Sequence, residues 1–578
     1  MFRYYMIKIL KVSVKFRCIS HCTVSAIKRV IILALLLFAG QSVAQKKVLV
    51  NFQQAINKVI QAARPASVRI WGFDLQQNQR TTAQFSGVVV SADGIILTAA
   101  HTIISGKTYK VFFPDGKECI ATALGRIDNP NTPGMPDVGM MKITDPGIWP
   151  FAALGNSDAL EIGDRCFSIA YPETLNQDQP SIRMGEIAEV KNSYGFIRST
   201  CKMEPGDSGG PLFDHQGRVI GLHSAIDVAL DQNFEIPVAL YSTYWNALKQ
   251  PRTYSSFPIR TTSRPDTVIA KNAIPEKWNT VSLQDKKQKT FTYSLSSSLN
   301  GKTQHVQSTL INWHSPSGKT QYLISKHSLI GDKPVLELYP GKKISIIAID
   351  RAQDLVLLQV SIKLPGGFDF QATKEEQIIL PQGKMIWSGV SGRSMQTGII
   401  GGSLNNLAKT SSQPYLGILV MYNSSPAQVS LVRPESPAAN AGLKLGDELI
   451  SINGKKVSSS IEFSSELLDL WPGDQIELEW RNESTVNKKI INLAVLPSGS
   501  SNHPADKFKG GKSIRRDGFG ELFFHDATIE PQECGTPVIS SEGSFLGLNI
   551  ARFSRTSTLA LPAHILYRFI ASAASPNQ

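Results

Sequence analysis

Cysteines are few in this chain, and metal-ligand patterns are missing. Only 6 of its 578 residues are cysteine, and two of these lie in the first 44 residues. The other four show no short spacing typical of a disulfide-stapled scaffold, and no CxxC or HExxH pattern indicates a zinc site. We therefore expect no metal, while a disulfide between Cys166 and Cys201 stays open. The four cysteines are Cys119, Cys166, Cys201 and Cys534.

Long runs of one residue type are also missing. Charged residues make up 19% and hydrophobic residues 42% of the chain, as in an ordinary globular protein, and no acidic or basic run indicates a disordered tail. Basic and aromatic residues do not interleave along a stripe, so we expect no nucleic-acid partner. The length of 578 residues suits roughly three or four domains.

The first 44 residues contain no acidic side chain. They carry seven basic residues, then the apolar run 30–39, then Ser42-Val43-Ala44. This pattern predicts a signal peptide cleaved after Ala44. The apolar run is short for a membrane span, although an uncleaved anchor is the alternative. Without this segment the formal charge falls from +13 to +6. We therefore expect an exported protein, periplasmic or secreted, without stable membrane insertion after cleavage.

The most informative stretch is EPGDSGGPL at 204–212. Glycine, aspartate and serine favour turns, so a plain surface turn is the simplest interpretation. Glycine also lets the backbone pass close beneath an attacked carbonyl. We assign Ser208 as a nucleophile, with the N–H groups of Gly206 and Ser208 directed at the developing oxyanion.

A serine nucleophile needs a base and an orienting acid, and both are found upstream. His101 ends the second strand of an Asp-Gly hairpin predicted over 85–101. Asp137 opens the short apolar strand predicted over 138–143. The order His101, Asp137, Ser208 therefore predicts a catalytic triad, in which His101 is the general base and Asp137 orients it.

These motifs resemble those of trypsin-like serine peptidases of the bacterial HtrA/Do type. The resemblance covers residues 51–250 and rests on SGVVVSADGIILTAAH, DVGMMKI, GNSDALEIGD, EPGDSGGPLFDHQGRVIGL and FEIPVAL. It implies two β-barrels with the triad between them, no cofactor, and Met203 in the wall of a specificity pocket for medium apolar side chains. The chain lacks an Arg-Ile-Val-Gly-Gly junction, so activation by a freed N-terminus is not implied.

The peptidase pattern starts again after residue 286. Strand, hairpin and strand are followed by His327, and Asp354 then opens a second apolar strand. The segment EPQECGTPVISSEGSFLGL at 530–548 aligns without gaps on 204–222 and places Cys534 at the nucleophile position. The sequence therefore predicts a second trypsin-like domain with a degenerate triad of His327, Asp354 and Cys534.

Some residues around Cys534 favour catalysis by its thiol, and others argue against it. A thiolate beside the cation of Lys326 would be a competent nucleophile. However, Gln532 stands where the oxyanion glycine should be, and Thr536 replaces the second glycine after the nucleophile. We expect this domain to serve structure or regulation, an active cysteine peptidase being the alternative.

An inserted segment separates Asp354 from Cys534. Residues 413–497 resemble a PDZ domain through YLGI, SPAANAGLKLGDELISINGKKV and WPGD. A helix is predicted after the capping pair Ser459 and Glu462. By this resemblance, one loop and the groove beside that helix would bind a peptide C-terminus, a PDZ domain used only as a spacer being the alternative. The loop residues are Tyr415, Leu416, Gly417 and Ile418.

The sequence as a whole predicts a mainly β protein with two chymotrypsin-like double β-barrel domains, the second interrupted by an α+β PDZ domain. We expect an exported serine endopeptidase that cleaves unfolded or damaged proteins and whose PDZ and second domains bind C-terminal peptides and regulate it. A non-catalytic peptide-binding scaffold is the alternative, and a homo-oligomer is left open. The predicted parts are a signal peptide (1–44), a trypsin-like domain (45–250), a linker (251–286), the first part of the second trypsin-like domain (287–412), the PDZ domain (413–497), and a flexible return linker with the last part of the second domain (498–578).

Overall fold

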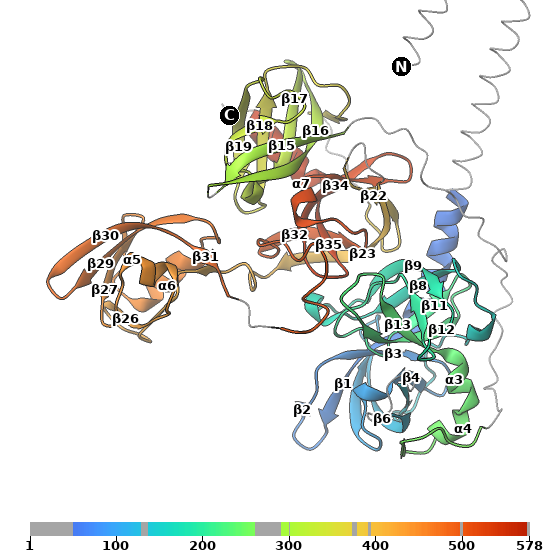
Figure 1. The fold of residues 1–578 in the computed structure, drawn as a ribbon. Helices are drawn as coiled ribbons and strands as arrows, with labels where there is room; N and C mark the ends of the chain where they lie inside the picture. The colour runs from blue at the N-terminus through green and yellow to red at the C-terminus, as the bar shows by residue number, and fades with distance from the viewer. Residues whose placement is uncertain are drawn as a thin grey trace, which may run out of the picture. The chain divides into compact units, whose positions relative to one another are not determined.

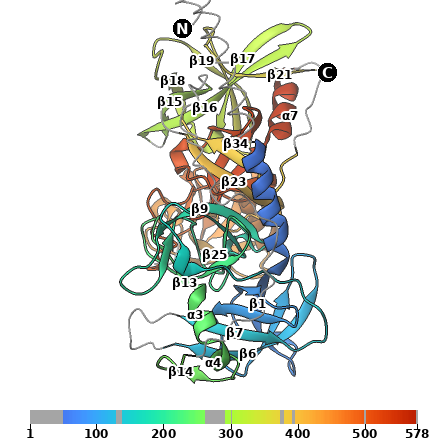
Figure 2. The same cartoon turned by 90° about the vertical axis from the view of Figure 1, so that its right-hand side faces the viewer.

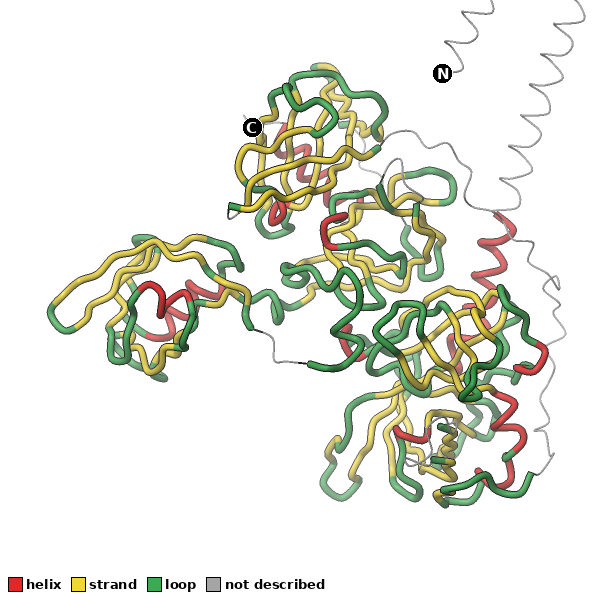
Figure 3. The backbone as a smooth tube through the Cα atoms, in the orientation of Figure 1, coloured by secondary structure: helices red, strands yellow, loops and turns green. Residues whose placement is uncertain are grey.

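The computed structural model describes residues 50–128, 137–260, 291–299, 301–372, 379–390, 395–497 and 501–574. The predicted signal peptide and most of the predicted linker lie outside these ranges. From Ile56 onward, the described residues belong to one compact unit. Strands dominate it (Figures 1 and 3), which confirms the predicted fold class. No helix within the described ranges is long and apolar enough to cross a membrane.

The first sheet of the first domain is organised by the predicted Asp-Gly hairpin. Gly94 adopts a φ of +92°, which favours glycine, at the turn joining two wholly buried strands. Side chains along the longest strand alternate between buried and partly exposed, as expected of a sheet with one face on a core. The strand order is β14 (Thr253–Tyr254), β6 (Glu118–Ile127), β5 (Thr108–Phe112), β1 (Ser67–Asp74), β3 (Phe85–Val89), β4 (Ile95–Ala99), β7 (Val138–Ile143), and β6 also pairs with β7.

A closed barrel follows in the same domain. The helix at residues 50–63, which precedes the first sheet in sequence and is drawn in blue in Figure 2, reaches this barrel, since its Ala62 and Ala63 lie close to Gly217. The barrel order is β10 (Ile197–Ser199), β13 (Asn233–Pro237), β12 (Val219–Ile226), β11 (Pro211–Asp214), β8 (Arg165–Ala170), β9 (Ser181–Glu189). Helix α3 (Val238–Thr243) follows the last strand.

The second domain repeats this arrangement, with α7 (Ala563–Ala574) in the place of α3. Its barrel has the strand order of the first barrel, which supports the predicted internal repeat. Its open sheet runs β18 (Asp332–Leu336), β15 (Thr292–Leu299), β16 (Lys302–Ser315), β17 (Gly318–Lys326), β20 (Leu355–Val360), β19 (Ile344–Asp350). Its barrel runs β22 (Met385–Ser388), β23 (Gln396–Leu407), β32 (Phe519–His525), β35 (Thr558–Pro562), β34 (Phe545–Arg552), β33 (Pro537–Ser540).

The α+β insertion lies between β23 and β32, which pair with each other in the second barrel. Ser459 caps α6, since its side chain accepts the N–H of Glu462, as predicted. Phe463 on α6 is buried, whereas Leu468 at its end is 52% exposed. The insertion contains β24 (Pro414–Tyr415), β25 (Ile418–Val420), β26 (Ala427–Val432), α5 (Pro437–Ala441), β27 (Glu448–Ile452), β28 (Lys455–Lys456), α6 (Ser460–Leu468), β29 (Gln475–Asn482), β30 (Thr485–Asn492) and β31 (Ala494–Val495).

Two predicted boundaries need correction. Residues 253–254, expected in the linker, form β14 and pair with β6, and the Phe257 ring stacks on Tyr244, so the first domain extends past residue 250. The return segment was expected to be flexible. Its Ala505 and Phe508 are 7% and 4% exposed, because they pack against the rest of the fold.

Candidate active site

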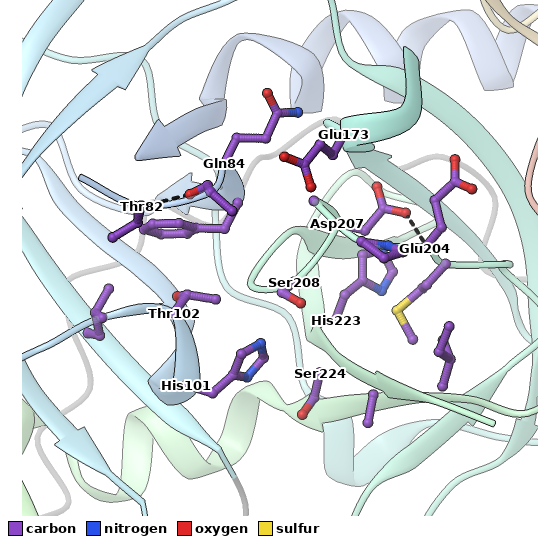
Figure 4. A pocket seen from close by; sticks show the side chains of 18 of the residues that line it. Thr82, Gln84, His101, Thr102, Glu173, Glu204, Asp207, Ser208, His223 and Ser224 are labelled. Atoms are coloured by element: carbon purple, nitrogen blue, oxygen red, sulfur yellow. Dashed lines mark hydrogen bonds between the residues drawn. The ribbon is translucent and has the colours of Figure 1, made fainter. Parts of the chain in front are cut away.

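The predicted triad comes together at one pocket of the first domain (Figure 4). His101 lies in the 3₁₀ turn that follows β4, and Asp137 immediately precedes β7. Ala99 at the end of β4 pairs with Val138 at the start of β7, so the strand register sets His101 beside Asp137. Ser208 is in the loop before β11, and the pocket, of about 580 Å³, is lined by both His101 and Ser208.

Asp137 holds the His101 ring. His101 Nδ1 lies 2.5 Å from Asp137 Oδ2, and the His101 backbone N–H donates to Asp137 Oδ1 at 2.7 Å. Ser224 Oγ also donates to Asp137 Oδ2, at 2.9 Å. With Nδ1–H directed at the carboxylate, Nε2 is left to act as the base. Ser224 was not predicted from the sequence, because it belongs to no motif and reaches Asp137 only through folding.

The pKa of His101 reflects two opposed effects. Burial lowers it, whereas the hydrogen bond and the negative charge of Asp137 raise it, and the net result is a pKa above the ordinary value of 6.5. Within the described residues, no hydrogen bond joins Ser208 Oγ to the His101 ring, although Figure 4 shows both side chains directed into the pocket. Catalytic hydrogen bonds are often loose before substrate binds.

The backbone before Ser208, predicted to bind an oxyanion, makes a sharp turn at Gly206. Gly206 has a φ of +97°, and a Cβ there would lie 2.4 Å from the backbone nitrogen of Glu173, so only glycine fits. Pro205 O, which belongs to the same peptide group as the Gly206 N–H, accepts the Glu173 N–H at 2.8 Å. In the described structure, neither the Gly206 N–H nor the Ser208 N–H donates a hydrogen bond. Both are free to bind a developing oxyanion.

A buried ion pair supports the nucleophile loop. Arg183 on β9 binds the Asp207 carboxylate through both terminal nitrogens, at 2.6 and 2.7 Å. The two side chains are 3% and 1% exposed. A bidentate pair fixes geometry as well as charge, so it holds the residue next to Ser208 in place. The sequence alone did not single out Arg183, which lies 24 residues from Asp207.

Met203 lines the same pocket as His101 and Ser208. It is 3% exposed, and its N–H donates to Asn233 Oδ1 at 3.2 Å. His223 also lines the pocket, but its ring is bound to Ser168 Oγ at 2.7 Å, and burial lowers its pKa to about 3. A neutral histidine and a methionine suit an apolar side chain.

The second domain does not rebuild the triad, and the predicted role of His327 is wrong. Lys326 pairs with Leu355, as Ala99 pairs with Val138 in the first domain. Because His101 is the second residue after Ala99, its equivalent is the second residue after Lys326, which is Ser328. Asp354 accepts the Ser328 N–H at 2.7 Å and the Ser328 hydroxyl at 2.8 Å.

Lys326 occupies the remaining space around that carboxylate. Its ammonium lies 2.8 Å from Asp354 Oδ2 and donates to the carbonyls of Arg515 and Ile550 at 2.9 and 2.7 Å. The cation expected to activate Cys534 is therefore engaged elsewhere. Burial raises the pKa of the Cys534 thiol despite the charge of Lys326, and this thiol is fully buried.

The turn before Cys534 also differs from its counterpart. Residues Pro531–Glu533 form a 3₁₀ turn, and the Cys534 N–H donates to Pro531 O at 3.3 Å. The amide that should bind an oxyanion is thus used inside the turn. Gln532, which replaces Gly206, is accommodated because a helical turn does not require a positive φ.

The loop 415–418 of the insertion, predicted to bind a peptide carboxylate, approaches Ser436 closely at Gly417. Gly417 has a φ of +86°, and a Cβ there would lie 2.1 Å from Cβ of Ser436. Leu416 is 2% exposed and anchors the loop in the core of the insertion. The conformation suits peptide binding beside α6, which stays a prediction.

The described residues contain no group of three or more His, Cys, Asp or Glu side chains arranged to hold a metal ion. Cys166 Sγ and Cys201 Sγ lie 3.8 Å apart in the first barrel as free thiols.

Comparisons identify both kinds of domain. A family model for the trypsin-like peptidase domain matches residues 85–222, and one for the PDZ domain matches residues 414–493. A probable periplasmic serine endoprotease DegP-like of Chlamydia muridarum is 32% identical over 26% of this chain and 29% of the relative. A putative serine protease HhoB of Synechocystis is 30% identical over 30% of this chain and 43% of the relative.

The chain spans less than half of the length of these relatives. A serine endoprotease from Yersinia pestis of known structure aligns over 76% of this chain and 98% of its own, with 16% identity and a TM-score of 0.29, too low for the two arrangements to be compared. Residues 85–222 thus belong to a trypsin-like peptidase domain and residues 414–493 to a PDZ domain, and the peptidase part is homologous to DegP/HtrA serine endoproteases.

Proposed function

We propose that this protein is an exported serine endopeptidase. The observation that carries the proposal is the pocket in which the oriented His101 ring and Ser208 lie beside two unengaged N–H groups. The names of the relatives, which are serine proteases described as periplasmic or putative, agree with it.

The residues divide the reaction as follows. His101 Nε2 takes the proton of Ser208 Oγ as this oxygen attacks the peptide carbonyl, and the N–H groups of Gly206 and Ser208 bind the oxyanion. His101 then gives the proton to the leaving amine, and the acyl group stays on Ser208. A water molecule, deprotonated by His101, hydrolyses the acyl-enzyme. Asp137 stabilises the imidazolium formed in each step.

The substrate follows from the pocket and the domains. Met203 in the pocket wall favours medium apolar side chains before the cleaved bond. Such side chains are buried in folded proteins, so unfolded or damaged exported proteins are the substrates that expose them. A peptide-library profile should show apolar residues at this position, and a profile dominated by Arg, Lys, Asp or Glu would contradict the assignment.

Contacts link the PDZ domain to the second domain, and the segment that leaves the PDZ domain reaches the catalytic pocket. Arg515 lies 3.4 Å from the centre of the Trp471 ring of the PDZ domain and 3.7 Å from Asp354 of the second domain. His503, in the segment that leaves the PDZ domain, lines the catalytic pocket. Peptide binding should therefore change activity, with a coupling of about 1–3 kcal/mol. Calorimetry with apolar C-terminal peptides and their amidated forms tests the carboxylate site, and equal affinities would contradict it.

A fluorophosphonate probe separates the peptidase from the non-catalytic scaffold. The proposal predicts covalent labelling of the full chain that disappears in Ser208→Ala. Folded wild-type protein that stays unlabelled, with circular dichroism showing intact structure, would support the scaffold instead.

A further inference from the structure

Glu204, in the nucleophile loop, has a buried carboxylate that the proposed chemistry does not use. Its side chain is 4% exposed, and its Oε1 accepts hydroxyls from Thr174 at 2.7 Å, Ser554 at 3.1 Å and Thr556 at 2.7 Å. A carboxylate can be buried only if donors replace its lost water. Two of its three donors, Ser554 and Thr556, come from the turn between β34 and β35 of the second domain.

The Glu204 segment leads into the oxyanion hole. The Glu204 N–H donates to Asp207 Oδ2 at 2.9 Å (Figure 4), and Asp207 is held by Arg183. Burial raises the pKa of Glu204, and the charge of Asp207 raises it further. The hydroxyl donors oppose this rise, so they allow two carboxylates to lie in one buried loop.

Arg555, between Ser554 and Thr556 in the chain, contacts Asn233, which binds Met203 of the pocket wall. Its side chain is fully buried and donates to Ala229 O at 2.6 Å, to Val228 O at 3.2 Å and to Asn233 Oδ1 at 3.3 Å. The same Asn233 oxygen accepts the Met203 N–H. Arg555 therefore braces the residue that positions Met203.

Lys202 makes a third contact with the second domain. Its ammonium donates to the Asp526 carbonyl and, at 2.9 Å, to Thr528 Oγ1. Its side chain is thus directed away from the catalytic pocket, whose lining it does not join. In addition, Asp526 Oδ2 accepts the Met184 N–H of β9 at 2.8 Å.

We propose that the second domain is a built-in positioning element for the catalytic cleft of the first. Ser554 and Thr556 position the nucleophile loop through Glu204, and Arg555 positions the specificity pocket through Asn233. This inference rests on the proposed function, because it assigns a role in hydrolysis at Ser208. The second domain, which has no working triad, thereby contributes to hydrolysis by positioning residues of the first domain.

Two variants test whether the hydroxyl groups that bind Glu204 are needed for activity. Thr556→Val with Ser554→Ala removes both donors at nearly constant shape, whereas Thr556→Ser keeps a hydroxyl. We expect the double variant to lose about tenfold or more in the rate of fluorophosphonate labelling of Ser208 and in kcat, because a charge-assisted hydrogen bond contributes this much. Thr556→Ser should stay within about twofold of wild type on the same grounds. Thr485→Val on the exposed edge of the PDZ domain is the matched control.

Labelling of wild type and of the double variant separates a failure of the proposed function from a failure of this inference. Wild-type protein that is not labelled would overturn the proposed function and this inference with it. Wild type and double variant labelled at the same rate would overturn the inference alone. If the double variant unfolds, hydrogen exchange of the amides at 203–208 in Thr556→Val decides, since faster exchange than in wild type supports the inference and unchanged exchange contradicts it.

Discussion

In the first and second domains, Ser208 and Cys534 lie just before equivalent barrel strands, β11 and β33. The two domains differ in the turn that leads to these residues. In the first, Gly206 at a φ of +97° leaves the Ser208 N–H unengaged. In the second, the 3₁₀ turn containing Gln532 takes up the Cys534 N–H. Equivalent barrel strands are therefore preceded either by a loop with unengaged N–H groups or by a closed turn, and the local backbone conformation decides which.

The two domains also differ in the groups that bind the aspartate of each. Asp137 in the first domain faces a histidine, whereas Asp354 in the second faces Ser328 and the ammonium of Lys326. A buried carboxylate with a permanent cation is structural, whereas one that orients an imidazole supports proton transfer. Asp354 is thus bound by Ser328 and Lys326, and none of its hydrogen bonds in the described structure orients a histidine.

The largest effect is expected at the two histidines. His101→Ala should lower kcat/KM by about four orders of magnitude or more, because the general base is lost. His327→Ala, the matched variant of the second domain, should leave kcat/KM unchanged. Steady-state kinetics with circular dichroism checks both, and a near-normal His101→Ala enzyme would refute the assignment of the base.

The next effect concerns the ion pair beneath the nucleophile. Arg183→Met should cost about 3–5 kcal/mol in unfolding free energy, because it strands the buried Asp207 carboxylate. Arg165→Met, which breaks the exposed pair with Glu186 in the same barrel, should cost about 1 kcal/mol or less. Urea unfolding measures both, and equal losses would show that Arg183 has no special role.

Exchanging the turns sharpens the contrast. Gly206→Gln, which copies the second domain, should lower kcat by about 10²–10³-fold, because one oxyanion donor is displaced. Gln532→Gly should create no activity in a Ser208→Ala background. A Gly206→Gln enzyme with unchanged kcat would mean that the oxyanion hole lies elsewhere.

Local motifs made much of this site predictable. His101, Asp137, Ser208 and Gly206 were found from contiguous patterns, because their neighbours fix turn and strand ends. Ser224 and Arg183 were missed, since only folding brings them to Asp137 and Asp207.

The second domain shows how sequence alignment can mislead. Matching histidine to histidine pointed to His327, but the register of β17 on β20 places Ser328 beside Asp354. The strand pairing is the same as in the first domain, and His327 stands one residue too close to the end of β17 to face Asp354.

A smaller effect is expected in the pH profile. His101 must be neutral to accept a proton, so its raised pKa puts the acid limb of kcat/KM above 6.5, with activity present at higher pH and lost as pH falls through that pKa. Asp137→Asn removes the charge that raises the pKa, so the residual activity should show an acid limb at lower pH. An unmoved limb would show that another group titrates.

The central claim, that only the first of the two repeats performs catalysis, is tested most directly by peptide hydrolysis in Ser208→Ala compared with Ser208→Ala/Cys534→Ala. The account predicts the same low residual rate in both proteins, together with slow alkylation of Cys534 by iodoacetamide near neutral pH. Residual hydrolysis by Ser208→Ala that disappears when Cys534 is also replaced would contradict it.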